Sequence, residues 1–323
     1  MIAKLLTQLN EVELDNYKKS NFYRHHVLSN YKYTDNTIFY YTEYFNNEYT
    51  NCTIIVFDEY ENAVLAFYAF ANTSVLSYFE LPVSIIETLF SNSFQKNRAY
   101  GQLLIKLSEL ISQNNFKELR FYSNEYLCAA FYSKIKKVDV EYSCLIDLTI
   151  PEEIIKTSIR KSYKSLVNWG EKNLDMLLID HKNVDYNRFV EFKNFHIQTA
   201  GRKTRSDKSW DIQFDCIKNN EAFLLLGYLS GQLVSGSLIL CGATEAYYGV
   251  GVYNRQLMAE KVAVGHYNIL KAIYECKNKG LNLINLGSIT KNSEDEKERN
   301  IFKFKSGFSN FFKSDVINFV DIE

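Results

Sequence analysis

The sequence predicts an α/β fold made of two tandem domains, each with a mixed sheet flanked by helices. Three β-type segments, a helix and a further strand occur in the same order once in each half of the chain, which indicates a duplicated domain. A strand, a helix and a second strand in that order favour a parallel pair with the helix on one face. The length of 323 residues suffices for two cores, and the predicted domains are 1–145 and 146–323.

The first half opens with a polar, tyrosine-rich region that we expect to be helical. Strands are expected over 53–57, 63–70 and 74–81, where β-branched and aromatic residues dominate, and the acidic turn DEYEN joins the first two. A helix is expected over 99–113, because apolar residues recur there at helical spacing. A strand over 117–123 follows it.

The second half repeats this order. Strands are expected over 221–229 and 232–240, and the Ser-Gly turn between them predicts a hairpin. A third strand is expected over 244–253. The segment 263–288 then predicts a helix, a glycine turn and a buried strand.

A basic segment lies between the two halves. Pro151 is expected to open a helix with acidic residues in its first turn, a favourable place for negative charge. Arg160, Lys161, Lys164 and Lys172 follow. Such a run is more often a solvated helix face than a binding site.

Composition excludes several classes of protein. The net charge of -1 argues against a protein that coats DNA or RNA, since that function needs a strong positive field. The six cysteines and five histidines are scattered, so we expect neither a disulfide framework nor a metal site. The longest apolar stretch, 63–71, is too short for a transmembrane segment. We therefore expect a cytoplasmic protein.

Two predicted helix starts carry a base and a glycine, Arg98 with Gly101 and Lys261 with Gly265. Free backbone N–H groups at a helix N-terminus bind phosphates. These turns are similar to the R/Q-x-x-G-x-G/A turn of acyl-CoA-binding acetyltransferases of the GNAT class, although each lacks the second small residue. They are candidate cofactor-binding residues, and an ordinary glycine beside a helix start is the alternative.

The segment 298–312 places two lysines and an arginine among five phenylalanines. Cations beside aromatic rings suit a phosphorylated or carboxylated ligand. In a strand, Lys303 and Lys305 would share one face and Phe304 would point the other way; in a helix they would not. A surface lysine lying over aromatic neighbours is the ordinary alternative for Lys305.

From Val140 to the end, about half of its length, the chain resembles the Fem-type (FemABX-like) transferases, which carry two GNAT-like (acyl-CoA N-acyltransferase) domains. The matching segments occur in the family's order: LIDLTIPEEIIKTSIRKSYKSLV, FVEFKNFHIQTAGRK, YYGVGVY, HYNILKAIYECKNKGLNLINLG and FKSGF. The helical arm with which some members contact transfer RNA has no counterpart. The resemblance therefore implies two tandem GNAT-like domains of the armless type.

The resemblance also implies an activity and a site. Fem-type enzymes add amino acids from aminoacyl-tRNA to the amine of a peptidoglycan precursor, and distant relatives acylate other amines, some from acyl-CoA. Phe304 and Lys305 match the family's FK pair, Arg202 matches the arginine after its T-A-x signature, and Tyr248 matches a strand tyrosine. These positions bind the acceptor and steady the acyl group in the family. Tyr247 points to the opposite face of a strand, so one of the two tyrosines is expected in the core.

The chemistry of these residue types agrees with amide formation. Attack of an amine on an ester or thioester forms an oxyanion, which the Lys305 ammonium can stabilise. The amine must also lose a proton, and Glu80 on the third predicted strand is the candidate base, with a purely structural carboxylate as the alternative.

We therefore predict a cytoplasmic N-acyltransferase that acts on an amine of a cell-envelope precursor, either a muropeptide or an amino sugar. The acceptor, a small molecule or a nucleotide-linked glycan, is expected in a groove of the second domain near Arg202, Tyr247, Tyr248, Lys303 and Phe304. We expect no tightly bound cofactor, and the donor is acyl-CoA or aminoacyl-tRNA. Two alternatives stay open: an acetyl-CoA-dependent sugar N-acetyltransferase, and a non-catalytic module that binds RNA or an anionic surface through 160–172.

Overall fold

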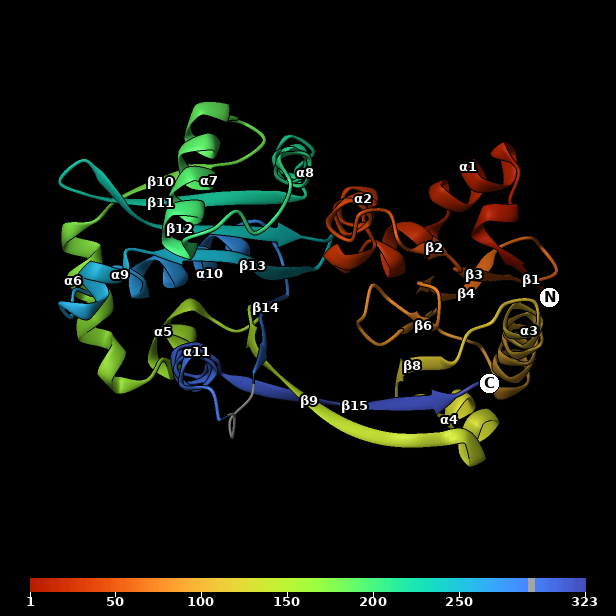
Figure 1. Ribbon diagram of the computed structural model, residues 1–323. Coiled ribbons are helices and arrows are strands. Elements are labelled where there is room, and N and C mark those ends of the chain that lie inside the picture. The colour runs from red at the N-terminus through yellow and green to blue at the C-terminus, as the bar shows by residue number, and fades with distance from the viewer. Residues whose placement is uncertain (290–293) are drawn as a thin grey trace. The chain divides into compact units, whose positions relative to one another are not determined.

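The computed structural model describes residues 1–289 and 294–323, which divide into two compact units (Figure 1). Unit 1 contains Met1–Ser29, Phe45–Glu141 and Ser314–Glu323, and unit 2 contains Asn30–Tyr44 and Tyr142–Lys313. The predicted domain boundary at 145/146 lies close to Glu141, after which the chain passes from unit 1 to unit 2. Two segments are assigned differently: Asn30–Tyr44 belongs to unit 2 and Ser314–Glu323 to unit 1. Both differences arise from packing between residues that are distant in the sequence.

Unit 1 contains an antiparallel sheet in the order β1-β3-β4-β7 and strands in the order β15-β8-β6-β5-β2. The strands of the first group are β1 (Ile2–Leu5), β3 (Ile54–Phe57), β4 (Ala63–Phe67) and β7 (Ile85–Glu87). Those of the second group are β2 (Thr50–Asn51), β5 (Phe70–Ala71), β6 (Val75–Ser77), β8 (Glu118–Tyr122) and β15 (Phe311–Asp321). The predicted strand 63–70 is thus divided between β4 and β5.

Three α-helices belong to the described part of unit 1: α1 (Glu11–Lys19), α3 (Ser93–Ser112) and α4 (Glu125–Phe131). The helix α3 follows β7 and precedes β8, and β8 pairs in parallel with β6. Its buried residues Ala99, Leu103, Leu107 and Leu110 recur at helical spacing and pack into one core with Leu119 of β8. The carboxyl-terminal residues Val320 and Ile322 enter the same core, which explains why the end of the chain belongs to unit 1.

Unit 2 contains one sheet in the order β10-β11-β12-β13-β14-β9. Its strands are β9 (Ile135–Asp147), β10 (Asp175–Ile179), β11 (Ala222–Leu229), β12 (Gln232–Cys241), β13 (Glu245–Tyr253) and β14 (Leu283–Ile289). Neighbours are antiparallel except β13 and β14, which are parallel and are joined through a helix. The predicted order of three strands, a helical segment and a strand is present in unit 2, whereas in unit 1 the five strands β3 to β7 precede α3 and β8.

Helices cover both faces of the unit 2 sheet (Figure 1). The α-helices of unit 2 are α2 (Asp35–Tyr44), α5 (Glu152–Ser158), α6 (Lys164–Asn173), α7 (Tyr186–Ala200), α8 (Asp207–Lys218), α9 (Arg255–Ala259), α10 (His266–Asn278) and α11 (Glu296–Ser306). Along β12, Ile239 packs on the side of α5 and α10, whereas its neighbours Leu238 and Leu240 pack on the side of α7 and α8. Burial on both faces explains the uninterrupted apolar runs of the sequence.

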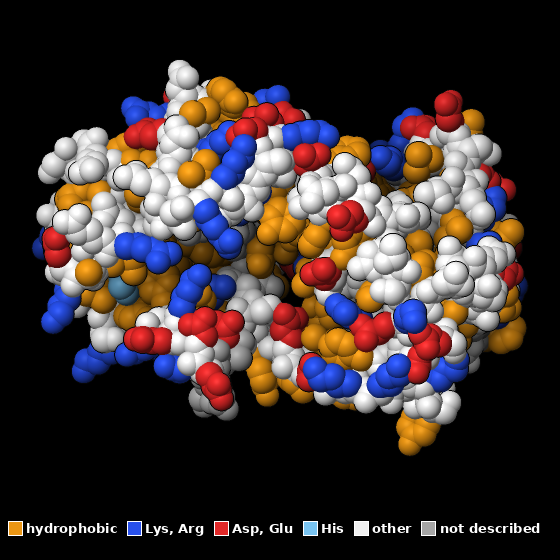
Figure 2. Space-filling model, viewed as in Figure 1, with side chains coloured by type: hydrophobic (Ala, Val, Ile, Leu, Met, Phe, Trp, Pro, Cys, Tyr) orange, Lys and Arg blue, Asp and Glu red, His pale blue; other side chains and the backbone are white. Residues whose placement is uncertain are grey.

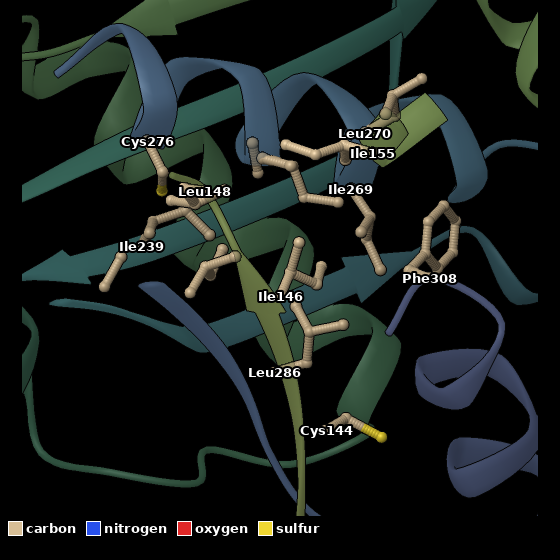
Figure 3. Close-up of a cluster of buried hydrophobic side chains, with 14 of the residues drawn as sticks. Cys144, Ile146, Leu148, Ile155, Ile239, Ile269, Leu270, Cys276, Leu286 and Phe308 are labelled. Carbon is tan, nitrogen blue, oxygen red and sulfur yellow. The ribbon is translucent and has the colours of Figure 1, made fainter. Parts of the chain in front are cut away.

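The core on the α10 side is shown in Figure 3. Ile269 and Leu270 of α10 and Ile155 of α5 lie against Ile146 of β9 and Ile239 of β12. All five are at most 2% exposed. Deleting a side chain of this kind commonly costs 2 to 5 kcal/mol, so this core fixes α10 on the sheet.

The segment Asn30–Tyr44 belongs to unit 2 because its aromatic side chains pack there. Tyr31 stacks on Tyr247 of β13 with ring centroids 4.7 Å apart and an interplanar angle of 8°. Asn30 donates a hydrogen bond to Glu245 at 2.8 Å. Within the described residues, no helix combines the length and the hydrophobicity that crossing a bilayer requires.

Candidate functional site

The parallel strands β13 and β14 pair over only three residues each. Glu245–Tyr247 pair with Leu283–Asn285, and the pairing then stops although both strands continue. A β-bulge at Gly249 adds to this irregularity, since Ile239 opposes Tyr248 while Leu238 opposes Val250. The second half of β13 therefore does not pair with β14, which leaves room for a pocket on that side.

A pocket of about 700 Å³ lies beside this half of β13. It is lined by four elements of unit 2, namely α7, β13, α9 and α11, through His196, Thr199, Ala200, Tyr248, Gly251, Val252, Tyr253, Arg255, Met258, Glu296, Lys297, Asn300, Ile301, Phe304 and Lys305. Figure 2 shows hydrophobic side chains in a hollow on this side of unit 2, with lysine and arginine side chains around it. A mainly apolar pocket with few polar groups is typical of a small-molecule site.

Lys305 contributes a partly buried cation to this pocket. Its ammonium nitrogen lies beside Gly287 of β14, where an added Cβ would stand only 2.9 Å from it. Burial lowers the pKa of Lys305, because leaving water disfavours the charged form. Over residues 1–289 and 294–323, no carboxylate forms an ion pair with this ammonium. An anion or a developing oxyanion in the pocket would therefore find a poorly solvated positive charge.

Tyr248 is held by a buried chain of polar groups. Its hydroxyl hydrogen-bonds to the Tyr253 hydroxyl and, at 3.4 Å, to Ser237, which also contacts Asn268. Burial raises the pKa of Tyr248 and of Tyr253, so both phenols are neutral. Gly251 makes room for this arrangement, because a Cβ there would overlap the Tyr248 hydroxyl. Both tyrosines line the pocket.

Phe304 belongs to an aromatic cluster behind Lys305. Its ring lies 5.2 Å from His266, 5.6 Å from Phe308 and 6.0 Å from Tyr253, all in edge-to-face contact. Burial lowers the pKa of His266 to about 4, so the imidazole is neutral at pH 7. The imidazole packs within this cluster, and its Nδ1 has no hydrogen-bond partner among the described residues.

Arg160 and Tyr163 fasten the carboxyl end of α11. Arg160 Nη1 donates to the carbonyl of Lys303 at 2.8 Å, and Arg160 Nη2 donates to Ser306 Oγ at 3.0 Å. The Tyr163 hydroxyl donates to the same carbonyl of Lys303 at 2.9 Å. These contacts satisfy backbone acceptors at a helix end and fix the turn that carries Lys305. The remaining bases of the run, Lys161, Lys164 and Lys172, are exposed.

The terminal FK element is helical, which decides between the two geometries considered for it. Phe304 and Lys305 line the pocket, whereas Lys303 is exposed and does not. Of the two geometries left open, the helix is the one present, so Lys303 and Lys305 do not share a face, since residues two apart on a helix point in different directions. The alternation of phenylalanines and lysines did not decide between them, because it is also compatible with a helix that is buried on one side.

The remaining candidate substrate-binding residues are Tyr247, Tyr248 and Arg202. Tyr248 lines the pocket, and Tyr247 packs against Tyr31; both tyrosines are half-buried, and each packs against a different core of unit 2. Arg202 is exposed in the loop after α7, two residues beyond Ala200, and does not line the pocket. Gly201 ends that helix in a left-handed conformation at φ 69° and turns the chain away.

Glu80 lies in a turn and not on a strand. The strand β6 ends at Ser77, and Glu80 follows in an exposed turn with φ 70° and with its N–H donating to Ser77 Oγ at 3.2 Å. The predicted strand position is therefore wrong. Glu80 is not among the residues that line the pocket.

The structure also contradicts the predicted helix start at Arg98 and Gly101, the first of the two candidate phosphate-binding turns. Asn92 caps α3, so the helix begins at Ser93 and both Arg98 and Gly101 lie inside it. Their N–H groups belong to the interior of a helix, where such groups bond to carbonyls four residues earlier and are not available to phosphates. The predicted helix start at 99 is wrong, because the mostly polar residues 93–98 form the first turns of α3.

The second candidate turn does precede a helix. Gly265 is the residue before α10, and Lys261 is exposed with φ 65°. The ring of Tyr253 lies 3.1 Å from a Cβ built on Gly265, so an aromatic side chain covers this glycine. Neither residue lines the pocket of about 700 Å³. Their role as cofactor-binding residues stays a prediction.

Sequence reasoning missed several residues that line the pocket. His196, Met258 and Ile301 come from three helices. His196 lies within the matching segment FVEFKNFHIQTAGRK and Ile301 within 298–312, but neither was singled out, and Met258 occurs in a stretch without a motif. A signal for Ile301 was present, because it precedes the FK pair by one helical turn. For the other two, only the packing of α7 and α9 beside β13 reveals the position.

No protein-family model matches the sequence, and no curated protein matches it. Solved structures do match. A structure of FemX has 10% sequence identity and a TM-score of 0.69 over 98% of this chain and 97% of that chain. The structure of L-PGS from Bacillus licheniformis has 9% identity and a TM-score of 0.56 over 89% of this chain and 92% of that chain.

A conserved protein of unknown function from Bacteroides thetaiotaomicron has 10% identity and a TM-score of 0.57 over 99% of this chain and the whole of that chain. At such low identity these likenesses establish the fold and not the activity. They cover nearly the full length of FemX, including the first half, where the sequence offered no resemblance. The chain thus shares the α/β fold of FemX, and the predicted resemblance to the Fem-type transferases is confirmed at the level of fold.

Proposed function

We propose that this protein is an N-acyltransferase that moves an aminoacyl or acyl group onto an amine in the pocket of unit 2. The observation that carries the proposal is the partly buried ammonium of Lys305, which has no carboxylate partner among the described residues and lines a mainly apolar pocket. The fold shared with FemX and L-PGS supports a transferase over a binding module.

The proposed chemistry needs few side chains. The amine attacks the carbonyl carbon of an ester or thioester, and the carbonyl oxygen becomes an oxyanion beside Lys305 Nζ. A preplaced cation in a site with little water stabilises that oxyanion more than it stabilises the neutral carbonyl, which lowers the barrier. Collapse of the intermediate expels the alcohol or thiol and leaves an amide. Holding both reactants in one pocket supplies much of the remaining rate.

The proton released by the amine needs an acceptor within the same pocket. Glu80 does not line it, whereas Glu296 of α11 does. Glu296 is exposed. The amine must be neutral when it attacks, so Glu296, or water directly, would accept its proton before the attack. We assign Glu296, in place of Glu80, as the candidate base.

The acceptor and the donor are finer proposals. The resemblance to Fem-type transferases supports a cell-envelope precursor as the acceptor, either a muropeptide or an amino sugar, and aminoacyl-tRNA as the donor in the cytoplasm. Acetyl-CoA with an amino-sugar acceptor is the second candidate, and the place of Gly265 directly before α10 supports it. RNA binding through 160–172 is less favoured, because Arg160 is engaged with α11.

The test compares the two donors. The purified protein is incubated with labelled acetyl-CoA or with charged transfer RNA, together with amino-sugar and muropeptide acceptors, and the amide product is quantified. We expect product from one donor class and a higher melting temperature in its presence. Absence of product and of stabilisation with both donors would contradict the proposed function.

A further inference from the structure

We propose that the acyl group this protein transfers is apolar and larger than acetyl, and that its hydrocarbon part lies along Val252, Met258, Ile301 and Phe304. The inference rests on the proposed function and names the class of donor. It concerns which acyl group is accepted, whether that group arrives on coenzyme A or on transfer RNA.

The first argument is the exposure of large apolar side chains in the pocket. Met258 is 51% exposed and Ile301 is 39% exposed, and both line the pocket together with the buried Val252. Apolar surface that faces a pocket loses its contact with water when an apolar ligand covers it, and this transfer is favourable. Methionine adapts its shape to different chains, which suits a wall of this kind. A ligand with a hydrocarbon part would cover both side chains.

The second argument is that this wall itself carries no free polar group. The hydroxyls of Tyr248 and Tyr253 bond to each other, and the Tyr248 hydroxyl also accepts from Ser237. Val252, Met258, Ile301 and Phe304 have no polar side-chain atom that donates or accepts a strong hydrogen bond. A polar acyl substituent placed along them, such as a seryl side chain, would lose its water without gaining a partner from this wall. An apolar substituent has no such cost.

The third argument is the direction that Lys305 imposes. If its ammonium receives the carbonyl oxygen, the rest of the acyl group extends from that point across the pocket. The adjacent residue Phe304 and, one turn earlier on α11, Ile301 line that pocket too. Exposed charges occur on the same pocket at Arg255 and Lys297, where the anionic carrier of the acyl group would be held. The pocket therefore offers positive charge that could bind the carrier and apolar surface that could bind the acyl group.

The test measures kcat/KM for a series of donors that differ only in the acyl group. On coenzyme A the series is acetyl, butyryl and octanoyl, and on transfer RNA it is glycyl, seryl and leucyl. We expect kcat/KM to rise roughly tenfold or more from the smallest to the largest apolar group, because each added methylene covers pocket surface. Seryl-tRNA is expected to resemble glycyl-tRNA.

A variant that fills the pocket provides the matched arm. Ala200 is exposed and lines the pocket, so the larger side chain of Ala200→Phe is expected to take up pocket volume. The expected result is a loss of the preference for large groups, measured within the variant as the ratio of kcat/KM for the largest and the smallest apolar group. Ala129→Phe, at an exposed position of α4, is the control and keeps the preference.

The outcomes separate the two proposals. Turnover at equal kcat/KM for all acyl groups, or a preference that survives Ala200→Phe, overturns the inference about the acyl group and leaves the proposed function standing. Absence of turnover with every donor overturns the proposed function, and the inference falls with it.

Discussion

Lys305 Nζ lies against the backbone of Gly287. A Cβ built on Gly287 would stand 2.9 Å from this nitrogen and 3.3 Å from the Tyr247 hydroxyl. The glycine has φ 93°, a conformation that side chains rarely adopt. The ammonium of α11 therefore reaches strand β14 only because position 287 has no side chain.

Gly287→Ala is expected to remove transfer activity while the protein stays folded. The methyl group displaces Lys305 Nζ, and a misplacement of about 1 Å can cost on the order of a hundredfold in rate. The positive φ adds about 1 kcal/mol of destabilisation. Gly280→Ala is the matched control, because Gly280 has φ 76° and no atom within 4 Å of its Cβ position. Equal activity losses in both variants would show that strain, and not Lys305, is responsible.

Lys305→Met is expected to change the pH dependence of stability. The pKa of Lys305 is lowered from 10.5 by burial, so the unfolded chain binds more protons than the folded protein between the lowered pKa and 10.5. The free energy of unfolding of the wild type therefore rises with pH through that window, and the rise is absent in Lys305→Met. Denaturant unfolding between pH 7 and 10 measures this difference. Lys303→Met, at the exposed position of the same helix, should retain the rise.

Arg160→Ala is expected to loosen α11 and to lower activity. The substitution removes two hydrogen bonds from a charged group, to Lys303 and Ser306, at a cost of about 1 to 3 kcal/mol. Hydrogen exchange should show faster opening of α11 than in the wild type. Lys161→Ala, at an exposed neighbouring position, should change neither quantity. Unchanged exchange in Arg160→Ala would refute the role of this contact.

His266 predicts a loss of stability in acid. Its pKa is lowered from 6.5 to about 4, so the unfolded chain takes up a proton on this residue before the folded protein does. The free energy of unfolding should consequently fall as the pH drops from 6.5 to about 4. His266→Phe keeps the ring in its aromatic cluster and should flatten this part of the profile. His181→Phe, at an exposed position, should leave it unchanged.

Much of the fold could be predicted because its strongest signals are local. The runs of β11 and β12 are apolar on both faces, and the helical spacing of α10 is unbroken, so each predicted its element directly. The start of α3 was missed because a polar cap at Asn92 and a polar first turn carry no apolar periodicity. The membership of Asn30–Tyr44 in unit 2 depends on Tyr31 meeting Tyr247, a contact that local sequence does not encode.

The candidate site was less predictable. Phe304, Lys305 and Tyr248 followed from the resemblance and do line one pocket. Arg202 is only two residues from Ala200, but the helix end at Gly201 directs it to solvent. Such a reversal depends on one backbone conformation, which a motif of side chains cannot reveal.

The most direct test of the account is single-turnover transfer by Lys305→Ala compared with Lys303→Ala, with the preferred donor and with melting curves to verify folding. The account predicts that Lys305→Ala slows amide formation roughly a hundredfold or more, as expected for the loss of an oxyanion-stabilising group, while Lys303→Ala stays within about twofold of the wild type. Equal rates for Lys305→Ala and the wild type would contradict the account.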